Sequence, residues 1–245
     1  MILAFDLDGT LAQSKSPIDE QMKSLLVKLL FSNRVCVISG GKIEQFKEQL
    51  IGPLIPTCDG FERLHLFPTS GTSYYTVGEN GDLKNVYKND LEDDEVSVIF
   101  RVFNEAFVQT GYYEPTTFGD VLEERGSQVT FSALGQEAPY ELKKGWDPTR
   151  SRRHEILDIM RPLLPDFDVR LGGTTSIDVT RRGMDKGFAV EMIEKYLHCK
   201  REDILFFGDA LEPGGNDHAV YKAGVPCVPV ADHIDCVWKV KLHTK

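Results

Sequence analysis

Apolar runs and amphipathic stretches alternate near both ends of the chain. Runs at residues 2–5, 34–38 and 204–207 have the length and composition of buried strands. Between the first two runs, apolar side chains recur every three or four positions from 22 to 30, which predicts a helix. The same spacing returns after residue 186. Strands that alternate with helices in this way predict an α/β fold with a Rossmann-like parallel sheet.

The middle of the chain has a different pattern. From 84 to 184, helical spacing and strand-like runs occur without the strand-helix alternation. This mixture predicts an inserted α+β domain at 84–184 and assigns 1–83 and 185–245 to the core. The elements expected in the insert are helices near 96–107 and 156–163, a hairpin over 121–134, and strands over 168–171 and 175–179.

Two carboxylates stand at the end of the first predicted strand. Asp6 and Asp8 are separated by one apolar residue, and Gly9 then allows the chain to turn. Alternate residues of a strand point to the same side, and open α/β sheets bind ligands at the carboxyl ends of their strands. Because two close carboxylates repel each other, the pair predicts a bound cation such as Mg²⁺. A strand end followed by an Asx-type turn is the alternative interpretation.

Further polar residues follow the other predicted strands or begin predicted helices. Ser39 opens a Ser-Gly-Gly loop, for which two interpretations are open: an anion-binding helix start, or a loop in which Ser39 caps the next helix. Lys186 begins a helix, Asp209 follows the strand at 204–207, and the pair 216–217 is Asn-Asp. Singly, these residues fit a solvated lysine, a turn and a cap. Their order along the chain favours a phosphoryl-transfer site.

Each of these residue types has a role in phosphoryl transfer. Asp6 is expected to be the nucleophile that forms an aspartyl-phosphate, and Asp8 to protonate the leaving oxygen and then deprotonate the acceptor. Ser39 would donate a hydrogen bond to a phosphoryl oxygen, and Lys186 would offset the negative charge of nucleophile and phosphate. The expected Mg²⁺ ligands are Asp6, the Asp8 backbone carbonyl and Asp209, with Asn216 or Asp217 close by.

Composition narrows the classes of protein. The 245 residues are 41% hydrophobic and 27% charged, as in soluble globular proteins. The formal net charge of −10 disfavours binding to nucleic acid or to an anionic membrane. No apolar run approaches the roughly 20 residues of a membrane span, and no signal peptide is evident, so a cytoplasmic protein is expected. The scattered cysteines, without a CxxC pair, are expected to be reduced thiols: Cys36, Cys58, Cys199, Cys227 and Cys236.

The motif set resembles the haloacid dehalogenase-like superfamily over essentially the whole chain. Asp6-Leu7-Asp8-Gly9-Thr10 is similar to its first motif, Ser39 to its second, Lys186 to its third, and Gly208-Asp209 with Asn216-Asp217 to its fourth. In that superfamily an insert between the second and third motifs is a cap over the site. The resemblance therefore implies a Mg²⁺-dependent enzyme whose residues 84–184 form a large α+β cap that confers substrate specificity.

Within that branch the chain most resembles eukaryotic-type phosphomannomutases. The matching stretches are Phe67-Pro68, Glu124-Arg125-Gly126, Gly172 to Val179 with Gly183 to Lys186, and Phe207-Gly208-Asp209 with Pro213 to His218. The resemblance implies that Arg125 grips the phosphate distant from the nucleophile and that Ser176 and Asp178 contact the sugar or its phosphate. Gly40, beside Ser39, is also expected at the substrate.

Two departures from the mutase pattern bear on the outcome of the reaction. The second motif reads Ser39-Gly40-Gly41-Lys42 instead of Gly-Gly-Ser-Asp, and a second cap arginine is replaced by Gln136. Arg150, Arg152 and Arg153 are nearby candidates for a replacement cation. An amide lacks the charge and fork of a guanidinium, so the predicted grip on a bisphosphate is weaker.

The first expectation is therefore a Mg²⁺-dependent phosphatase of a small phosphosugar or similar phosphate monoester. A phosphomannomutase-like isomerase of hexose 1- and 6-phosphates, with the same Asp6 chemistry, is the alternative. A non-catalytic, phosphate-binding member of the fold is the alternative from another class, but a pure binder needs neither Asp6 nor Asp8. The expected partner is a small-molecule phosphate ester, without nucleic acid or membrane, and the expected state is a monomer or homodimer.

Overall fold

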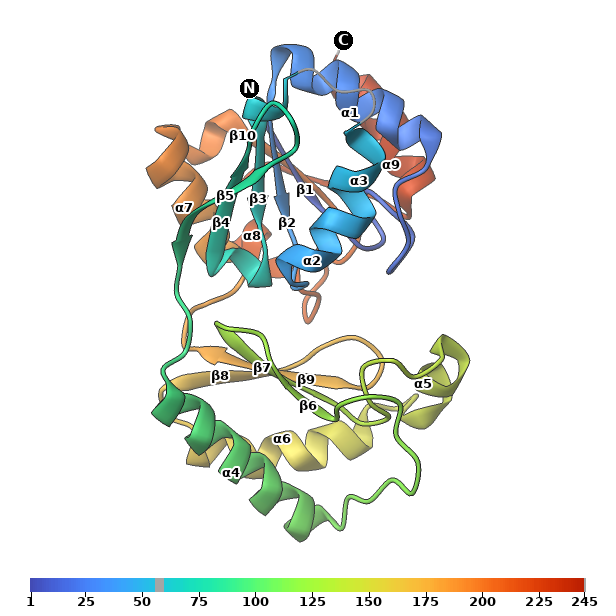
Figure 1. Cartoon of the computed structure of the whole chain (residues 1–245), viewed down its shortest axis with the longest axis vertical. Coiled ribbons are helices and arrows are strands. Elements are labelled where there is room, and N and C mark those ends of the chain that lie inside the picture. The colour runs from blue at the N-terminus through green and yellow to red at the C-terminus, as the bar shows by residue number, and fades with distance from the viewer. Residues whose placement is uncertain (56–59, 245) are drawn as a thin grey trace. The chain divides into compact units, whose positions relative to one another are not determined.

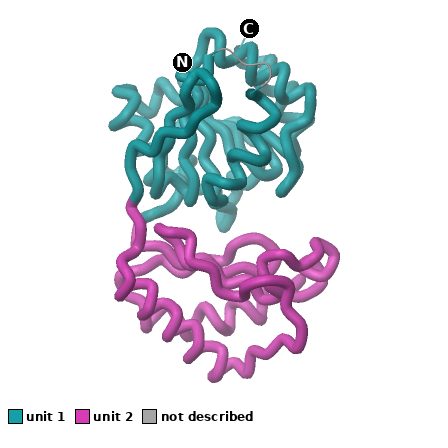
Figure 2. Tube along the Cα trace, viewed as in Figure 1, with its two compact units in different colours: residues 1–88, 184–245 teal, residues 89–183 magenta. Residues whose placement is uncertain are grey.

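The computed structural model describes residues 1–55 and 60–244. Within these residues the chain forms two compact units (Figure 2). Unit 1 comprises residues 1–88 and 184–245, and unit 2 comprises residues 89–183. Unit 2 is thus an insertion into unit 1 along the sequence.

Unit 1 is built on a seven-stranded sheet with the order β11-β10-β1-β2-β3-β4-β5 (Figure 1). Its strands are β1 (Ile2–Asp6), β2 (Arg34–Ile38), β3 (Leu64–Phe67), β4 (Ser73–Val77), β5 (Leu83–Lys88), β10 (Ile204–Gly208) and β11 (Cys227–Pro229). The pairings from β11 through β3 are parallel, and β4 and β5 add antiparallel strands at one edge. The predicted Rossmann-like parallel core is confirmed.

Helices cover both faces of this sheet. Apart from short 3-10 turns, the described helices of unit 1 are α1 (Glu20–Ser32), α2 (Ile43–Phe46), the π-helical η1 (Lys47–Ile51), α3 (Gly52–Leu54), α7 (Lys186–Leu197), α8 (His218–Lys222) and α9 (His233–His243). Along β1, Leu3 and Phe5 pack with residues of α1 and α9, whereas Ile2 and Ala4 pack with residues of α7. Successive strand residues point to opposite faces, so a strand buried on both sides is apolar throughout.

The inserted unit begins later than position 84, where the sequence pattern placed it. Leu83–Lys88 forms β5, which pairs with β4 across the turn at 78–82 and therefore belongs to the core sheet. Four of the six residues of β5 are exposed, so this strand has no apolar run by which the sequence pattern could have predicted it. Among the helices that the sequence pattern did not predict are α5 (Tyr140–Trp146), which has no buried residue, and α9.

Unit 2 is a two-layer α+β structure. Its antiparallel sheet has the order β6-β7-β9-β8, formed by β6 (Leu122–Glu124), β7 (Gln128–Ser132), β9 (Ser176–Arg181) and β8 (Phe167–Leu171). One face of the sheet, with Val129, Phe131 and Ile177, packs against α4 (Asp93–Thr110) and α6 (Ser151–Leu163). The other face carries polar residues. The predicted hairpin over 121–134 is present as β6 and β7.

Two further expectations bear on the described residues. Among them, no helix is long and apolar enough to cross a membrane. Cys36, Cys199, Cys227 and Cys236 carry free thiols, and Cys58 lies outside the described residues.

Candidate active site

The sheet topology of unit 1 brings three of the predicted site residues to one edge. Asp6 is the last residue of β1, and β1 lies between β10 and β2. Ser39 directly follows β2, and Asp209 directly follows β10. All three strands run parallel, so their carboxyl ends meet at the same edge of the sheet. Residues that are far apart in sequence therefore surround the Asp6 carboxylate.

Lys186 connects two carboxylates at this edge. Its Nζ donates hydrogen bonds to Asp6 Oδ1 at 2.5 Å and to Asp217 Oδ1 at 2.6 Å. The lysine is the first residue of α7, and Asp185 caps that helix by accepting a hydrogen bond from the Gly187 amide. Lys186 is 1% exposed and Asp217 is fully buried, so the solvated first-turn lysine considered for the sequence is wrong. A buried lysine is stable here because it is paired with two acids.

Burial and mutual repulsion set the protonation of the acids. Burial raises the pKa of Asp6 to about 7, and the negative charges of Asp217 and Asp209 add to this, while Lys186 acts in the opposite direction. Burial by itself lowers the pKa of Lys186, but the Asp6 and Asp217 carboxylates outweigh it and raise that pKa. Burial also raises the pKa of Asp209, with Asp217 as the next cause. An added cation beside these acids would favour their charged forms.

The acids form a group that fits a hard divalent cation. Carboxylate oxygens of Asp6, Asp209 and Asp217 all lie within 4.8 Å of one another. The set contains only oxygen donors, which suits Mg²⁺, and Asp217 is already oriented by the Ala210 amide at 3.1 Å. Of the two neighbours predicted near the metal, Asp217 belongs to this group, and Asn216 is exposed.

Gly9 has a conformation and a position that other residues tolerate poorly. Its φ of +87° lies in the left-handed region, and a Cβ atom built there would lie 2.4 Å from Asp209 Oδ2. The turn after Asp8 thus passes close to the Asp209 carboxylate. This close approach joins the first and fourth sequence motifs into one site, hereafter the acidic site: Asp6, Asp8, Lys186, Asp209 and Asp217.

Asp8 is held by two glutamines that sequence reasoning missed. Gln45 Nε2 donates to Asp8 Oδ2 at 2.6 Å, and Gln49 Nε2 donates to Asp8 Oδ1 at 3.3 Å. The backbone amide of Lys15 also donates to Oδ1, at 2.8 Å. Gln45 lies in α2 and Gln49 in η1, and Gln49 is 3% exposed. A buried glutamine on an otherwise apolar helix face was the available signal.

The Ser39 loop differs from a simple helix cap. Ser39 is 3% exposed, and its Oγ accepts a hydrogen bond from the Gly41 amide at 3.1 Å. The helix α2 begins later, at Ile43, with Lys42 in the cap position. Ser39 therefore keeps its hydroxyl proton for donation to another acceptor. Gly40 is half-buried, and a Cβ atom there would meet no atom within 4 Å, so the backbone at Gly40 has open space beside it.

The predicted specificity residues all lie on unit 2. Asp178 and Ser176 belong to β9, and Arg125 follows β6. Asp178 Oδ1 accepts hydrogen bonds from Thr130 Oγ1 at 2.8 Å and from Gln128 Nε2 at 2.9 Å. Arg125 donates to Glu123 at 2.9 Å and to Gln136 Oε1 at 2.9 Å. Together with their cross-strand neighbours they form the polar face of the unit 2 sheet: Glu123, Arg125, Gln128, Thr130, Ser132, Asp168, Arg170, Ser176, Asp178 and Thr180.

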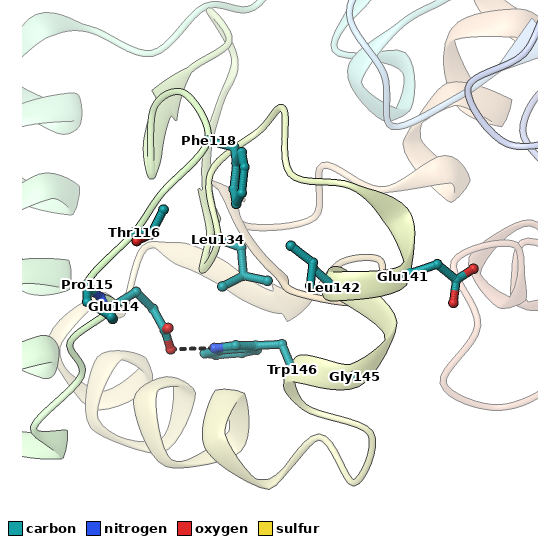
Figure 3. A pocket seen from close by; sticks show the side chains of 9 residues that line it. All are labelled: Glu114, Pro115, Thr116, Phe118, Leu134, Glu141, Leu142, Gly145 and Trp146. Atoms are coloured by element: carbon teal, nitrogen blue, oxygen red, sulfur yellow. Dashed lines mark hydrogen bonds between the residues drawn. The ribbon is translucent and has the colours of Figure 1, made fainter.

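A hollow of about 520 Å³ also lies on unit 2 (Figure 3). It is lined mainly by apolar side chains such as Phe118, Leu134 and Leu142, and the Trp146 indole donates a hydrogen bond to Glu114 at 2.6 Å. Its lining contains none of the predicted specificity residues, so it is separate from the polar face.

Solved structures of other proteins share the fold. The IMP-nucleotidase of Plasmodium falciparum has a TM-score of 0.73 at 13% identity, over 100% of this chain and 67% of that protein. A haloacid dehalogenase-like hydrolase from Bacteroides thetaiotaomicron has a TM-score of 0.66 at 15% identity, over 99% of this chain and 98% of the other. These similarities show that the chain has the haloacid dehalogenase-like fold.

Sequence comparison resolves the family. The model of the eukaryotic phosphomannomutase family matches residues 22–228, and the chain belongs to this family. The phosphomannomutase of Encephalitozoon cuniculi is 28% identical over 226 residues, which cover 90% of this chain and 84% of the relative. That of Saccharomyces cerevisiae is 26% identical over 231 residues, with coverages of 90% and 84%.

Proposed function

We propose that the protein is a hexose-phosphate mutase of the phosphomannomutase type, which interconverts hexose 1- and 6-phosphates. The observation that carries the proposal is the buried Asp6–Lys186–Asp217 ion-paired group at the carboxyl end of β1, in a chain of the phosphomannomutase family. Family membership now favours the mutase over the phosphatase that the loss of a cap arginine suggested. Hydrolysis remains the second candidate, since Gln136 accepts from Arg125 where a guanidinium was expected.

In the proposed reaction, Asp6 and Asp8 divide the work. An Asp6 carboxylate oxygen attacks phosphorus, the bond between phosphorus and the sugar oxygen breaks, and Asp8 gives its proton to that oxygen. In the return step Asp8 takes the proton from a sugar hydroxyl, whose oxygen attacks the phosphoryl group on Asp6. Gln45 and Gln49 keep the Asp8 carboxyl aimed through both steps. Atoms and protons balance once a hexose bisphosphate has supplied the first phosphoryl group to Asp6, and a bisphosphate is then the intermediate between the two monophosphates.

The other site residues hold charge and position. Lys186 keeps its positive charge, which offsets the negative charges of Asp6 and of the transferred phosphoryl group. The Ser39 hydroxyl donates a hydrogen bond to a phosphoryl oxygen. Asp6, Asp209 and Asp217 would hold Mg²⁺, which supplies charge neutralisation between phosphate and carboxylates when bound. The polar face of unit 2 is proposed to bind the sugar and its second phosphate through Arg125, Ser176 and Asp178.

The fate of the phosphoryl group tests this proposal. The enzyme is incubated with Mg²⁺, mannose 1-phosphate and a catalytic amount of glucose 1,6-bisphosphate, and the products are followed by phosphorus NMR. The mutase is expected to form mannose 6-phosphate much faster than inorganic phosphate. Release of inorganic phosphate as the main product would make hydrolysis the function. If neither mannose 6-phosphate nor inorganic phosphate formed, the proposed phosphoryl transfer on hexose phosphates would be wrong.

A further inference from the structure

Strand register places charged residues in a regular pattern on the polar face. Asp178 of β9 is paired with Thr130 of β7 on one side and with Arg170 of β8 on the other. Thr130 is paired in turn with Glu123 of β6. Residues directly opposite each other in antiparallel strands project from the same face. Arg170 therefore lies on the polar face, in the strand next to Asp178.

Arginines stand on both sides of the Asp178 carboxyl group. Arg125 lies beyond the end of β6, and Arg170 lies in β8, the strand on the other side of β9. Although burial raises the pKa of Asp178, the charges of both arginines act in the opposite direction, which places both guanidinium groups within electrostatic reach of this carboxyl. The field around Asp178 thus contains two cationic groups.

Each of these arginines is oriented by an acid on its own strand segment. Arg170 Nη2 donates to Asp168 Oδ2 at 2.6 Å, and Arg125 Nε donates to Glu123 at 2.9 Å. Asp168 is itself held by the Gly183 amide at 2.6 Å. The Arg170 side chain is 40% exposed, compared with 18% for Arg125, so a ligand on the polar face has access to it. A guanidinium carries five N–H donors in a planar fork, a geometry that matches the oxygens of a phosphate.

Two of the three arginines considered from the sequence as replacement cations, Arg152 and Arg153, have other contacts. Arg153 is 2% exposed, pairs with buried Asp147 at 2.9 Å and donates to the Gly173 carbonyl at 2.6 Å. The Arg152 guanidinium lies 4.3 Å from the centre of the Trp146 ring and 3.2 Å from Glu114. Both arginine side chains are therefore engaged with other residues of unit 2.

We propose that Arg170 is a substrate-binding residue, which with Arg125 forms a two-cation grip around Asp178 for a phosphate group of the sugar ligand. The inference rests on the proposed function and names a second cation for the polar face, which lies in β8, whereas Gln136 contacts Arg125 beside β6. A phosphate oxygen pair suits the planar guanidinium forks, and Asp178 is placed to accept from a sugar hydroxyl between them. Two guanidinium groups bind a phosphate dianion more strongly than one does. A bisphosphate intermediate needs such binding, because one phosphate must stay bound while the other reacts.

The test compares matched variants in the full-length protein. Arg170→Gln removes the charge, Arg170→Lys keeps the charge but loses the fork, and Arg101→Gln removes an exposed charge from α4. Calorimetry measures the Kd for glucose 1,6-bisphosphate, and kinetics measure KM and kcat for mannose 1-phosphate and for p-nitrophenyl phosphate. Thermal unfolding checks that each variant is folded.

Arg170→Gln is expected to weaken bisphosphate binding about tenfold, as loss of a charge-assisted hydrogen bond does, and to raise KM for the sugar phosphate. Turnover of p-nitrophenyl phosphate should stay within about twofold, since this ester has no second phosphate to grip. Arg170→Lys should recover part of the binding, and Arg101→Gln should bind like the wild type.

Several results would overturn the assignment. Arg170 would not belong to the site if Arg170→Gln bound the bisphosphate like the wild type, or if Arg101→Gln lost as much affinity as Arg170→Gln. The proposed function would still stand in either case, provided that the wild type isomerises the sugar phosphate. Equal losses with p-nitrophenyl phosphate and a lowered Tm would make Arg170 a structural residue. If the wild type neither binds nor converts hexose phosphates, the proposed function fails, and the Arg170 assignment fails with it.

Discussion

The acidic site of unit 1 and the polar face of unit 2 combine acids with cations in opposite ways. In the acidic site one buried lysine serves two carboxylates, and both contacts are 2.6 Å or less. On the polar face each arginine has its own acid, and the arginine side chains are partly exposed. Burial strengthens electrostatic interactions and makes unpaired groups costly, whereas exposed pairs are easily exchanged for other partners.

This difference fits a division of labour between the units. A reacting carboxylate needs a fixed cation that does not leave during the reaction, the role proposed for Lys186. A surface that binds and releases phosphosugars gains from cations that can exchange a protein acid for a ligand phosphate. The comparison therefore predicts that changes in unit 1 abolish chemistry, whereas changes on the polar face of unit 2 alter selectivity.

The largest expected effect comes from Asp6→Asn. The amide cannot form an acyl phosphate, so turnover should fall by about 10⁴-fold or more. Lys186 keeps its contact with Asp217, so the fold should persist, which circular dichroism can check. Steady-state kinetics with a phosphosugar and with a generic phosphate ester should show equal losses. Activity within about tenfold of the wild type would remove Asp6 from its proposed role.

Removal of divalent cations should have the next largest effect. Three carboxylates that lie close together without a metal repel each other, and a phosphate would add to this repulsion. Chelation by EDTA is expected to lower turnover by about 10³-fold, because a bound metal stabilises the charge of the transition state by several kcal/mol. Added Mg²⁺ should restore the turnover. Calorimetry of Mg²⁺ binding to Asp209→Asn is a second readout, with weaker binding expected. Full turnover after thorough chelation would contradict the assignment.

Within unit 2 the strongest structural effect should come from the buried pair of Arg153 and Asp147. Arg153→Met leaves Asp147 buried without its cation and frees the Gly173 carbonyl, so unfolding stability should fall by about 3 kcal/mol. The matched control is Arg152→Met, whose salt bridge with Glu114 is partly exposed and should contribute less than about 1 kcal/mol. Chemical denaturation measures both. Equal, small losses would mean that the buried pair adds no stability.

The smallest effect is a pH dependence located in the unit 1 core. His65 is 7% exposed, its Nδ1 lies 2.9 Å from the Tyr74 hydroxyl, and burial, aided by the charge of Arg34, lowers its pKa to about 4. Because the unfolded pKa is about 6.5, this residue's contribution to stability is complete above that pH and is lost as the pH falls toward 4. At pH 5 the loss is about 2 kcal/mol.

Denaturation at a series of pH values tests this dependence. His65→Gln should remove the part of the stability loss that develops between pH 6.5 and pH 4, whereas His154→Gln, at an exposed position in unit 2, should leave it unchanged. A slope that is the same in the wild type and in His65→Gln would show that another group titrates.

The two units also differ in how far the sequence predicts them. The strands and acids of unit 1 could be inferred because Asp6, Asp8 and Asp209 directly follow apolar runs, and strand ends are local features. The glutamines that orient Asp8 could not, since they reach it from another element. Arg170 was missed because its significance depends on strand register, which pairs it with Asp178 and which the hydrophobic pattern does not specify. The helix α5, without buried residues, and the mostly exposed β5 left no apolar signal.

In the proposed reaction Asp6 carries the phosphoryl group during turnover. The enzyme can be mixed with glucose 1,6-bisphosphate and Mg²⁺, quenched in acid and treated with borohydride, which reduces an acyl phosphate at its carbonyl carbon. Peptide mass spectrometry then locates the reduced residue. Modification is expected at Asp6 in the wild type, and none is expected in Asp6→Asn. Modification at another residue, or turnover of the sugar phosphate without any phosphorylated enzyme, would contradict it.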